Sequence, residues 1–225
     1  MNLPREGNIQ DRTRTSKHRQ PQFELIGGVL CLDFLNTLDD RYSSEPKELL
    51  KSYTDLARFA QDAGILTHLQ ADRLAAQSEK SPEPAQQVLA AAIEMREAMY
   101  AVFWALVRKK PLPPSALSTL NRYIQEAAQH ASLVPHAQHF EWQFDSSPDH
   151  LEAPLWPIAS SAAELLASDQ LQFVRACASK TCEWLFLDES KNHRRRWCDM
   201  TKCGNRAKVR RFYKSRLSRR KKAEE

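Results

Sequence analysis

Four of the five cysteines in this 225-residue chain lie within one segment of 27 residues near its C-terminal end. They form two close pairs with the same C-x4-C spacing, and fifteen residues separate the pairs. Two such pairs, joined by enough chain to turn back on itself, can place four thiolates around one tetrahedral zinc ion. Four thiolates leave no open position for water or substrate, so the metal would be structural. The sequence therefore predicts one structural Zn²⁺ bound by Cys177, Cys182, Cys198 and Cys203.

Other roles for the cysteines remain as alternatives. The same four residues could form two disulfides or stay as reduced structural thiols, and His193 could replace one cysteine as a ligand. Disulfides are disfavoured because the basic N-terminal segment lacks the apolar core of a secretory signal, so we expect a cytoplasmic protein. Cys31 stands alone in an apolar stretch and is expected to be a small core residue. No apolar run approaches the ~20 residues of a membrane-spanning helix, so no membrane association is expected.

The residues around the cysteine pairs predict the elements that hold the metal. Residues 184–187 read as a short apolar strand and 194–197 as its return strand after a polar turn. Gly204 permits close approach of the backbone to the sulfurs, and Asn205 is a favourable N-cap, so a helix is expected from about Arg206. The order of knuckle, hairpin, knuckle and helix is that of a treble-clef-like finger.

The helix that follows the last cysteine is predicted to have two different faces. Val209, Phe212, Tyr213 and Leu217 gather on one side of a helical wheel, and we expect this face to pack. Basic residues cover the rest of the helix and are suited to phosphate contacts, and Arg can also read guanine edges. The candidate nucleic-acid-binding residues are Arg194, Arg195, Arg196, Arg206, Lys208, Arg210, Arg211 and Lys214.

The charge of the chain is divided unevenly along its length. Residues 177–225 carry a net charge of +10, whereas residues 1–176 carry −5. This asymmetry indicates a polyanionic partner for the C-terminal part, and we expect DNA. RNA, an acidic protein partner and a merely solvated charged face are the alternatives. The small number of aromatic residues expected to be exposed in 206–222 disfavours stacking on single strands.

The larger N-terminal part is predicted to be mainly helical, since 5 Gly and 12 Pro disfavour a sheet-rich fold. Residues 1–21 are polar and aperiodic, so we expect a disordered arm and a fold that begins near Phe23. Apolar periodicity and capping signals place the elements that follow. In chain order these are a short helix over about 32–38, helices that begin at Pro46, Thr67, Ser81 and Ser115, a half-buried strand over 138–145, and a helix after Pro154 with a last turn capped by Ser168.

These elements define a mainly α (α+β) fold class. It consists of a helical domain with a small strand element over 22–176, a treble-clef-like zinc finger over 177–217 and a frayed basic tail over 218–225. An acidic helical domain joined to a basic finger suggests a sensor or a homodimerisation unit. Asp33, Asn36, Thr37 and Arg41 share one helical face and could line a polar pocket for a small-molecule effector, with Trp156 covering it. The alternative is that the polar residues cap backbone groups and Trp156 fills core space.

Motifs for enzymatic chemistry are absent from the sequence. It contains no Gly-rich phosphate loop, no G-x-S-x-G and no paired His-Glu zinc motif, so an enzyme is not predicted. His130, His136, His139 and His150 lie close together in the sequence. We expect them at a helix end, a loop and strand edges, and therefore expect neither a second metal site nor a catalytic role.

The segment CASKTCEWLFLDESKNHRRRWCDMTK, followed by Cys203-Gly204-Asn205-Arg206, resembles the CGNR zinc-finger family. The stretches GGVLCLDFLNTLDDR, SYTDLARFAQDAGIL, LVPH and APLWPIASSAAELL are similar to landmarks of the ABATE domain that accompanies this finger. The resemblance covers nearly everything from Phe23 to Leu217. It implies a bacterial, stress-induced transcription regulator whose C-terminal finger binds DNA, with the metal held by the same four cysteines.

Overall fold

The computed structural model of the chain describes residues 23–145, 147 and 150–223, so the arm expected over 1–21 lies outside the described residues. The fold begins at the expected position, because Phe23 is buried and packs edge-on against Phe59 with 5.4 Å between ring centroids. The helices are α1 (Leu30–Leu35), α2 (Tyr53–Asp62), α3 (His68–Lys80), α4 (Pro82–Val107), α5 (Pro114–Gln129), α6 (Leu155–Leu166) and α7 (Asn205–Ala223). The strands are β1 (Leu38–Asp39), β2 (Lys47–Glu48), β3 (Ala131–His136), β4 (His139–Phe144), β5 (Val174–Ala176) and β6 (Leu185–Leu187).

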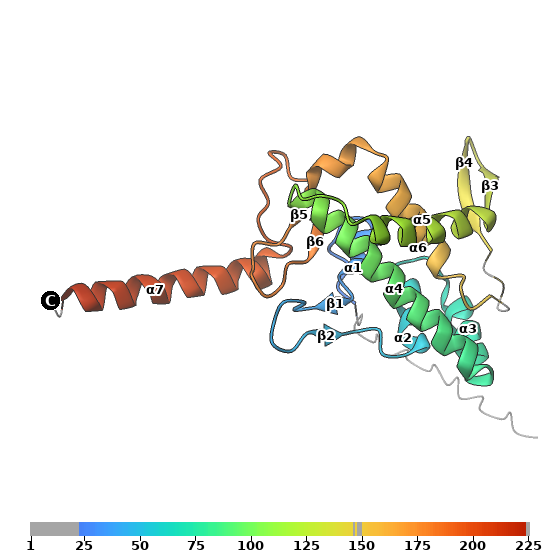
Figure 1. The fold of residues 1–225 in the computed structure, drawn as a ribbon, viewed down its shortest axis with the longest axis horizontal. Coiled ribbons are helices and arrows are strands. Elements are labelled where there is room, and N and C mark those ends of the chain that lie inside the picture. Colours follow the sequence, from blue (N-terminus) through green and yellow to red (C-terminus); the bar gives the residue numbers. More distant parts are fainter. Residues whose placement is uncertain (1–22, 146, 148–149, 224–225) are drawn as a thin grey trace, which may run out of the picture.

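The 26-residue helix α4 is the centre of the helical body (Figure 1). Pro82 occupies its first turn, as expected, because the ring fixes a helical φ where no N–H partner is needed. Helices α1, α2, α3, α5 and α6 all contact α4. Their apolar faces bury one continuous core that includes Leu32, Met95 and Ile158. The helical body built on this core positions the strands and the cysteine-rich region.

Side-chain caps fix the starts of α2 and α3, and several expected boundaries differ in the structure. The short helix expected over about 32–38 is α1, which ends at Leu35, and Leu38 lies in β1. Thr67 and Gln70 form the expected capping box of α3. The helix expected from Pro46 begins only at Tyr53, because Ser52 and Asp55 form a second capping box there. Residues 47–48 instead pair with β1. Helix α5 begins at Pro114, so Ser115 lies inside its first turn and is not its cap.

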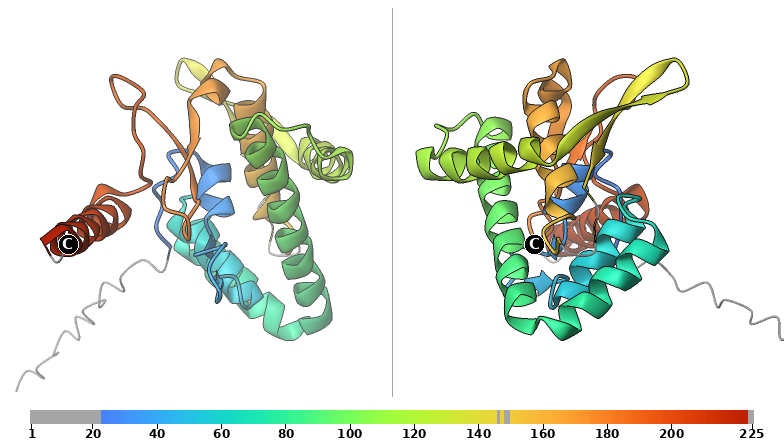
Figure 2. Two further views of the ribbon diagram at one scale, coloured as in Figure 1. Left: turned by 60° about the vertical axis from the view of Figure 1, so that its left-hand side comes forward. Right: turned by 90° about the vertical axis from the view of Figure 1, so that its right-hand side faces the viewer.

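The single strand expected over 138–145 is half of an antiparallel hairpin, β3–β4, which rises away from the helices (Figure 2). Phe140 and Trp142 are 68% and 56% exposed, so β4 is not half-buried as expected. The sequence does not reveal the partner strand because Pro135 lies within it. Proline is tolerated there because both strands of a two-stranded ribbon are edges.

Strand β6 connects the helical body to the cysteine-rich region. It pairs with β5, so the return strand expected over 194–197 does not form. Side chains of successive residues in a strand point to opposite faces. Leu185 and Leu187 therefore enter the core of the helical body, whereas Trp184 and Phe186 join a second core around the four cysteines. The boundary expected between residues 176 and 177 falls between the two strands of this sheet.

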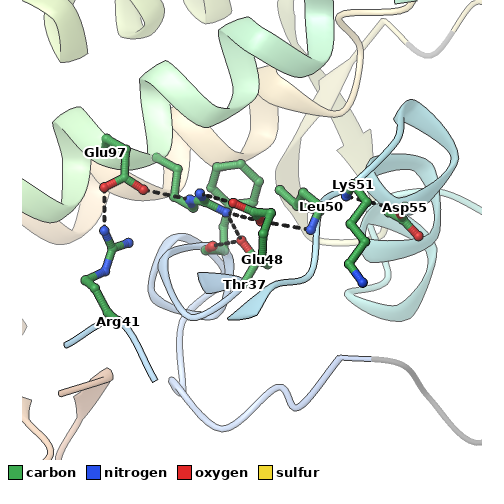
Figure 3. A network of polar contacts seen from close by, with 9 residues as sticks. Thr37, Arg41, Glu48, Leu50, Lys51, Asp55 and Glu97 are labelled. Carbon is green, nitrogen blue, oxygen red and sulfur yellow. Dashed lines mark hydrogen bonds and ion pairs between the residues drawn. The ribbon is translucent and has the colours of Figure 1, made fainter. Parts of the chain in front are cut away.

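A network of polar contacts that includes Glu97 of α4 and Glu48 of β2 joins the two elements (Figure 3). The Arg96 side chain is 2% exposed, and its guanidinium donates to both carboxylate oxygens of Glu48 at 2.7 and 2.6 Å. It also donates to Thr37 Oγ1 at 3.1 Å and to Glu97 at 3.0 Å, and Glu97 in turn binds Arg41. A charged side chain is usually kept inside a core in this way, paired with an opposite charge and held by several hydrogen bonds.

A search of the described helices finds none with the length and apolar character needed to span a membrane.

Candidate metal centre and nucleic-acid interface

The four cysteine sulfurs gather at one point within the second core. Sγ of Cys198 lies 3.6 Å from that of Cys182 and 3.7 Å from that of Cys203, and all four sulfurs lie within 4.8 Å of one another. A tetrahedron with Zn–S bonds of about 2.3 Å has edges of about 3.8 Å, so the sulfurs fit a zinc ion. All four residues are buried, and every cysteine of the chain is free. The disulfide alternative is therefore excluded, and Zn²⁺ is the cofactor that this set of ligands fits.

Hydrogen bonds to the sulfurs prepare them to bind a cation. Cys177 accepts from the backbone of Ser179, and Cys182 accepts from that of Trp184, which gives the same two-residue offset in both cases. The Arg206 guanidinium donates to Cys203 Sγ at 3.2 Å. The neighbouring thiols also act on each other: a hydrogen bond from Cys182 lowers the pKa of Cys177, and the same pairing raises the pKa of Cys182. Thiols this close cannot all ionise unless a cation balances them.

The first cysteine pair lies in the turn between β5 and β6, and the second pair leads into α7. Asp199 caps the start of the second segment, where its carboxylate accepts from the N–H groups of Thr201 and Lys202. Residues Met200–Gly204 form a π-helical turn that continues directly into α7. Asn205 is therefore not the expected N-cap. It has helical dihedral angles, and its side chain donates to the carbonyl of Thr201.

Gly204 lies against Met200 and Trp197 at the start of α7. A Cβ atom at this position would lie 2.9 Å from Sδ of Met200 and 3.4 Å from Cδ1 of Trp197. The absent side chain therefore makes room for Met200, and the expected close approach of the backbone to the sulfurs stays a prediction.

The loop between β6 and the second cysteine pair is organised around Asp188, which is fully buried. Its carboxylate accepts from the backbone and hydroxyl of Ser190 and from the backbone of Arg195, and these bonds hold the pKa of Asp188 below its usual value against the effect of burial. His193 stacks on Phe173 with 3.9 Å between ring centroids. It lies outside the cluster of potential metal ligands found among the described residues, so the alternative ligand is excluded.

Helix α7 projects from the body (Figure 1), and its apolar face does not pack as expected. Val209, Phe212 and Tyr213 are 54%, 56% and 60% exposed. The reason is geometric, since the helix runs past the end of the finger and away from the helical body (Figure 1). The side chains of Lys214 and Leu217 lie outside the described residues. The tail expected to fray from residue 218 is helical to Ala223.

The eight basic residues singled out from the sequence fall into two groups. Arg195 and Arg206 have partners inside the finger: Arg195 donates to the carbonyls of Trp197 and Cys198, and Arg206 donates to Cys203. The others with described side chains are exposed and, in the described part of the chain, form no ion pair. They are Arg194, Arg196, Lys208, Arg210 and Arg211.

A cleft of about 660 Å³ separates the start of α7 from the helical body. Glu24, Asp39 and Asp40 line one side, whereas Arg206 and Arg210 line the other. An ion pair between Lys202 and Glu24 connects the two sides. Lys47 also lines the first side and Asp199 the second, so the cleft next to the metal centre carries charges of both signs.

The residues expected to line an effector pocket each have a partner in the fold. The Asp33 carboxylate accepts the N–H of Gly27 at 2.7 Å, and burial raises the pKa of Asp33 to about 6. Asn36 bonds both backbone groups of Leu185. Thr37 and Arg41 belong to the Arg96 network described above. Trp156 is buried in the core and stacks on His130 with 3.7 Å between ring centroids.

Comparisons with known families divide the chain into the same two parts, the helical body and the cysteine-rich finger. A family model named ABATE and described as "Putative stress-induced transcription regulator" matches residues 28–169, more than half of the chain. The chain belongs to the ABATE family. C-terminal to this ABATE domain, the family model of the CGNR zinc finger matches residues 174–216. That match contains all four cysteines and begins at β5, and neither family is one of enzymes. No curated protein matches the chain.

Proposed function

We propose that the protein is a zinc-dependent transcriptional regulator that binds DNA through the CGNR finger and α7. The observation that carries this proposal is the position of α7, which extends from the metal centre with exposed basic side chains along it. Phosphate contacts require cations held at fixed positions, and a metal-anchored helix supplies them. The zinc ion has a structural role here: it closes the loop between the cysteine pairs and fixes the start of α7.

Basic residues of the finger with exposed side chains and those with hydrogen-bond partners inside the finger are expected to have different roles in DNA binding. Lys208 and Arg211 have exposed side chains, so their proposed role is phosphate binding. Arg195 holds the loop before Cys198 through carbonyl oxygens, so its proposed role is to keep the finger in shape. This difference can be tested with the zinc-loaded full chain.

The test is a salt series of binding to duplex DNA. Removal of one cation that pairs with a DNA phosphate makes the slope of log affinity against log salt concentration shallower by about 0.9. We expect this change of slope for Lys208→Ala and for Arg211→Ala. The control is Arg73→Ala on the exposed face of α3, which should leave the slope unchanged. Chelation of zinc should abolish high-affinity binding. Unchanged slopes in both α7 variants, or full affinity without zinc, would count against the proposal.

RNA is a second candidate ligand because of one specific observation. Phe212 and Tyr213 are exposed among the basic residues, contrary to the expectation that this segment would expose few aromatic side chains. Exposed aromatic rings beside cations are how proteins stack the bases of single strands. Phe212→Ala and Tyr213→Ala should each cost about 1–3 kcal/mol of single-stranded RNA affinity if stacking occurs. Duplex DNA binding should change much less, so the two ligands can be distinguished.

A further inference from the structure

The tip of the β3–β4 hairpin places three metal-binding side chains on one face. His136 and His139 are paired directly across the hairpin and joined by a two-residue turn. Residues two apart in a strand share a face, so Glu141 lies on the same side as His139. Nε2 of His139 is 2.8 Å and Nδ1 of His136 is 3.7 Å from Oε1 of Glu141. The sequence does not suggest this arrangement, because it predicts no strand at β3 and places His136 in a loop.

These distances suit a divalent transition-metal ion. Metal–nitrogen and metal–oxygen bonds of about 2.0–2.2 Å bring neighbouring ligand atoms to about 3–3.5 Å from one another. One ligand atom from each of the three residues lies within 4.8 Å of the others, and all three side chains are exposed, so small rotations suffice to close the site. Imidazole favours Zn²⁺, Ni²⁺, Co²⁺ or Cu²⁺ over Mg²⁺ and Ca²⁺.

We propose that His136, His139 and Glu141 form a second metal site that binds a first-row divalent transition metal. It differs from the finger in chemistry, because its ligands are nitrogen and oxygen rather than sulfur. It also differs in exchange behaviour, because three exposed ligands leave coordination positions to water, whereas the finger is closed by four buried thiolates. The β3–β4 hairpin lies on the side of the helical body away from α7 (Figure 1). A metal bound at the hairpin would therefore be exchangeable while the finger keeps its zinc.

The experiment uses the full chain with one zinc ion already bound. Cobalt(II) is added, and binding is followed by calorimetry, by near-ultraviolet and visible absorption, and by the zinc released. We expect one further equivalent of Co²⁺ with weak absorption from nitrogen and oxygen ligands and no release of zinc. Intense sulfur-to-cobalt charge transfer, with no more cobalt bound than zinc released, would overturn the proposal, as would the absence of a further equivalent.

Variants assign the ligands. Loss of an outer-sphere partner of a metal ligand already costs about 10–100-fold in affinity, so Glu141→Gln should weaken Co²⁺ binding at least about tenfold. The double variant His136→Ala, His139→Ala should lose the second equivalent and keep one zinc ion. His68→Ala is the matched control, since His68 is also exposed and lies 3.4 Å from a single carboxylate, that of Asp72. Far-UV circular dichroism should show the same helical content in all variants. Retention of the second equivalent in the double variant would refute the assignment.

Discussion

Asn36 is expected to contribute strongly to stability, because it bonds the edge of β6 from the end of α1. Its amide donates to the carbonyl of Leu185 at 2.9 Å and accepts the Leu185 N–H at 3.1 Å, and both residues are buried. Asn36→Ala would leave two buried backbone groups without partners. Each such group costs about 1–3 kcal/mol, so the free energy of unfolding should fall by roughly 2–5 kcal/mol. Asn36→Leu, which keeps most of the side-chain volume, should lose a similar amount.

The assay is urea unfolding of the zinc-loaded chain, followed by circular dichroism, with amide exchange at Leu185 as a local readout. Asn121→Ala on the exposed side of α5 is the control and should stay within about 0.5 kcal/mol of the unmodified chain. The Leu185 amide should exchange much faster in both Asn36 variants. A stability loss as small as that of the control, with Leu185 still protected, would show that the two hydrogen bonds are not needed to hold β6.

Three further changes test other parts of the fold. Arg96→Met removes a buried cation and leaves the Glu48 carboxylate, which is 32% exposed, with its hydrogen bond from the Leu50 N–H. The free energy of unfolding should fall by about 1–3 kcal/mol, and a loss below about 1 kcal/mol in denaturant titration would contradict the paired-charge interpretation. Because burial raises the pKa of Asp33 from 3.8 to about 6, its contribution is present below about pH 4 and is lost as pH rises through 6. Asp33→Asn keeps an acceptor for Gly27, so its stability relative to the unmodified chain should rise by at most about 3 kcal/mol across that window, and a flat difference would refute the raised pKa. Ala137 has φ +51° in the hairpin turn, so Ala137→Gly should slow amide exchange in β3 and β4, with a gain of about 0.5–1 kcal/mol, and faster exchange would show that the turn is not strained.

The metal centre is predictable because its information is local. A thiolate pair five residues apart and a second pair within reach leave few geometries other than one tetrahedral site. The starts of α3 and α4 are equally predictable from the sequence. Thr67 with Gln70 marks the start of α3, and Ser81 with Pro82 marks the start of α4. At both helix starts the interaction that decides the structure lies within one turn of the residue that signals it.

Features that depend on distant partners cannot be predicted in this way. Strand β5 has only three residues and no pattern of its own, so its pairing with β6 could not be read from either segment. Arg96 looks like a surface residue in the sequence, and its burial depends on Glu48, 48 positions earlier. The apolar row on α7 predicts a packing face because such rows usually have a partner, but the position of the helix leaves Val209, Phe212 and Tyr213 more than half exposed.

The alternating side chains of β6 bear on how this chain could have been assembled during evolution. A finger transferred by recombination onto an unrelated protein would carry Leu185 and Leu187 with it, and these two leucines would then face water. An ABATE domain left behind would have a gap in its interior at the same place. A recombination breakpoint between residues 176 and 185 would therefore destabilise both the separated finger and the separated ABATE domain. This favours inheritance of the ABATE domain and the finger together as one gene.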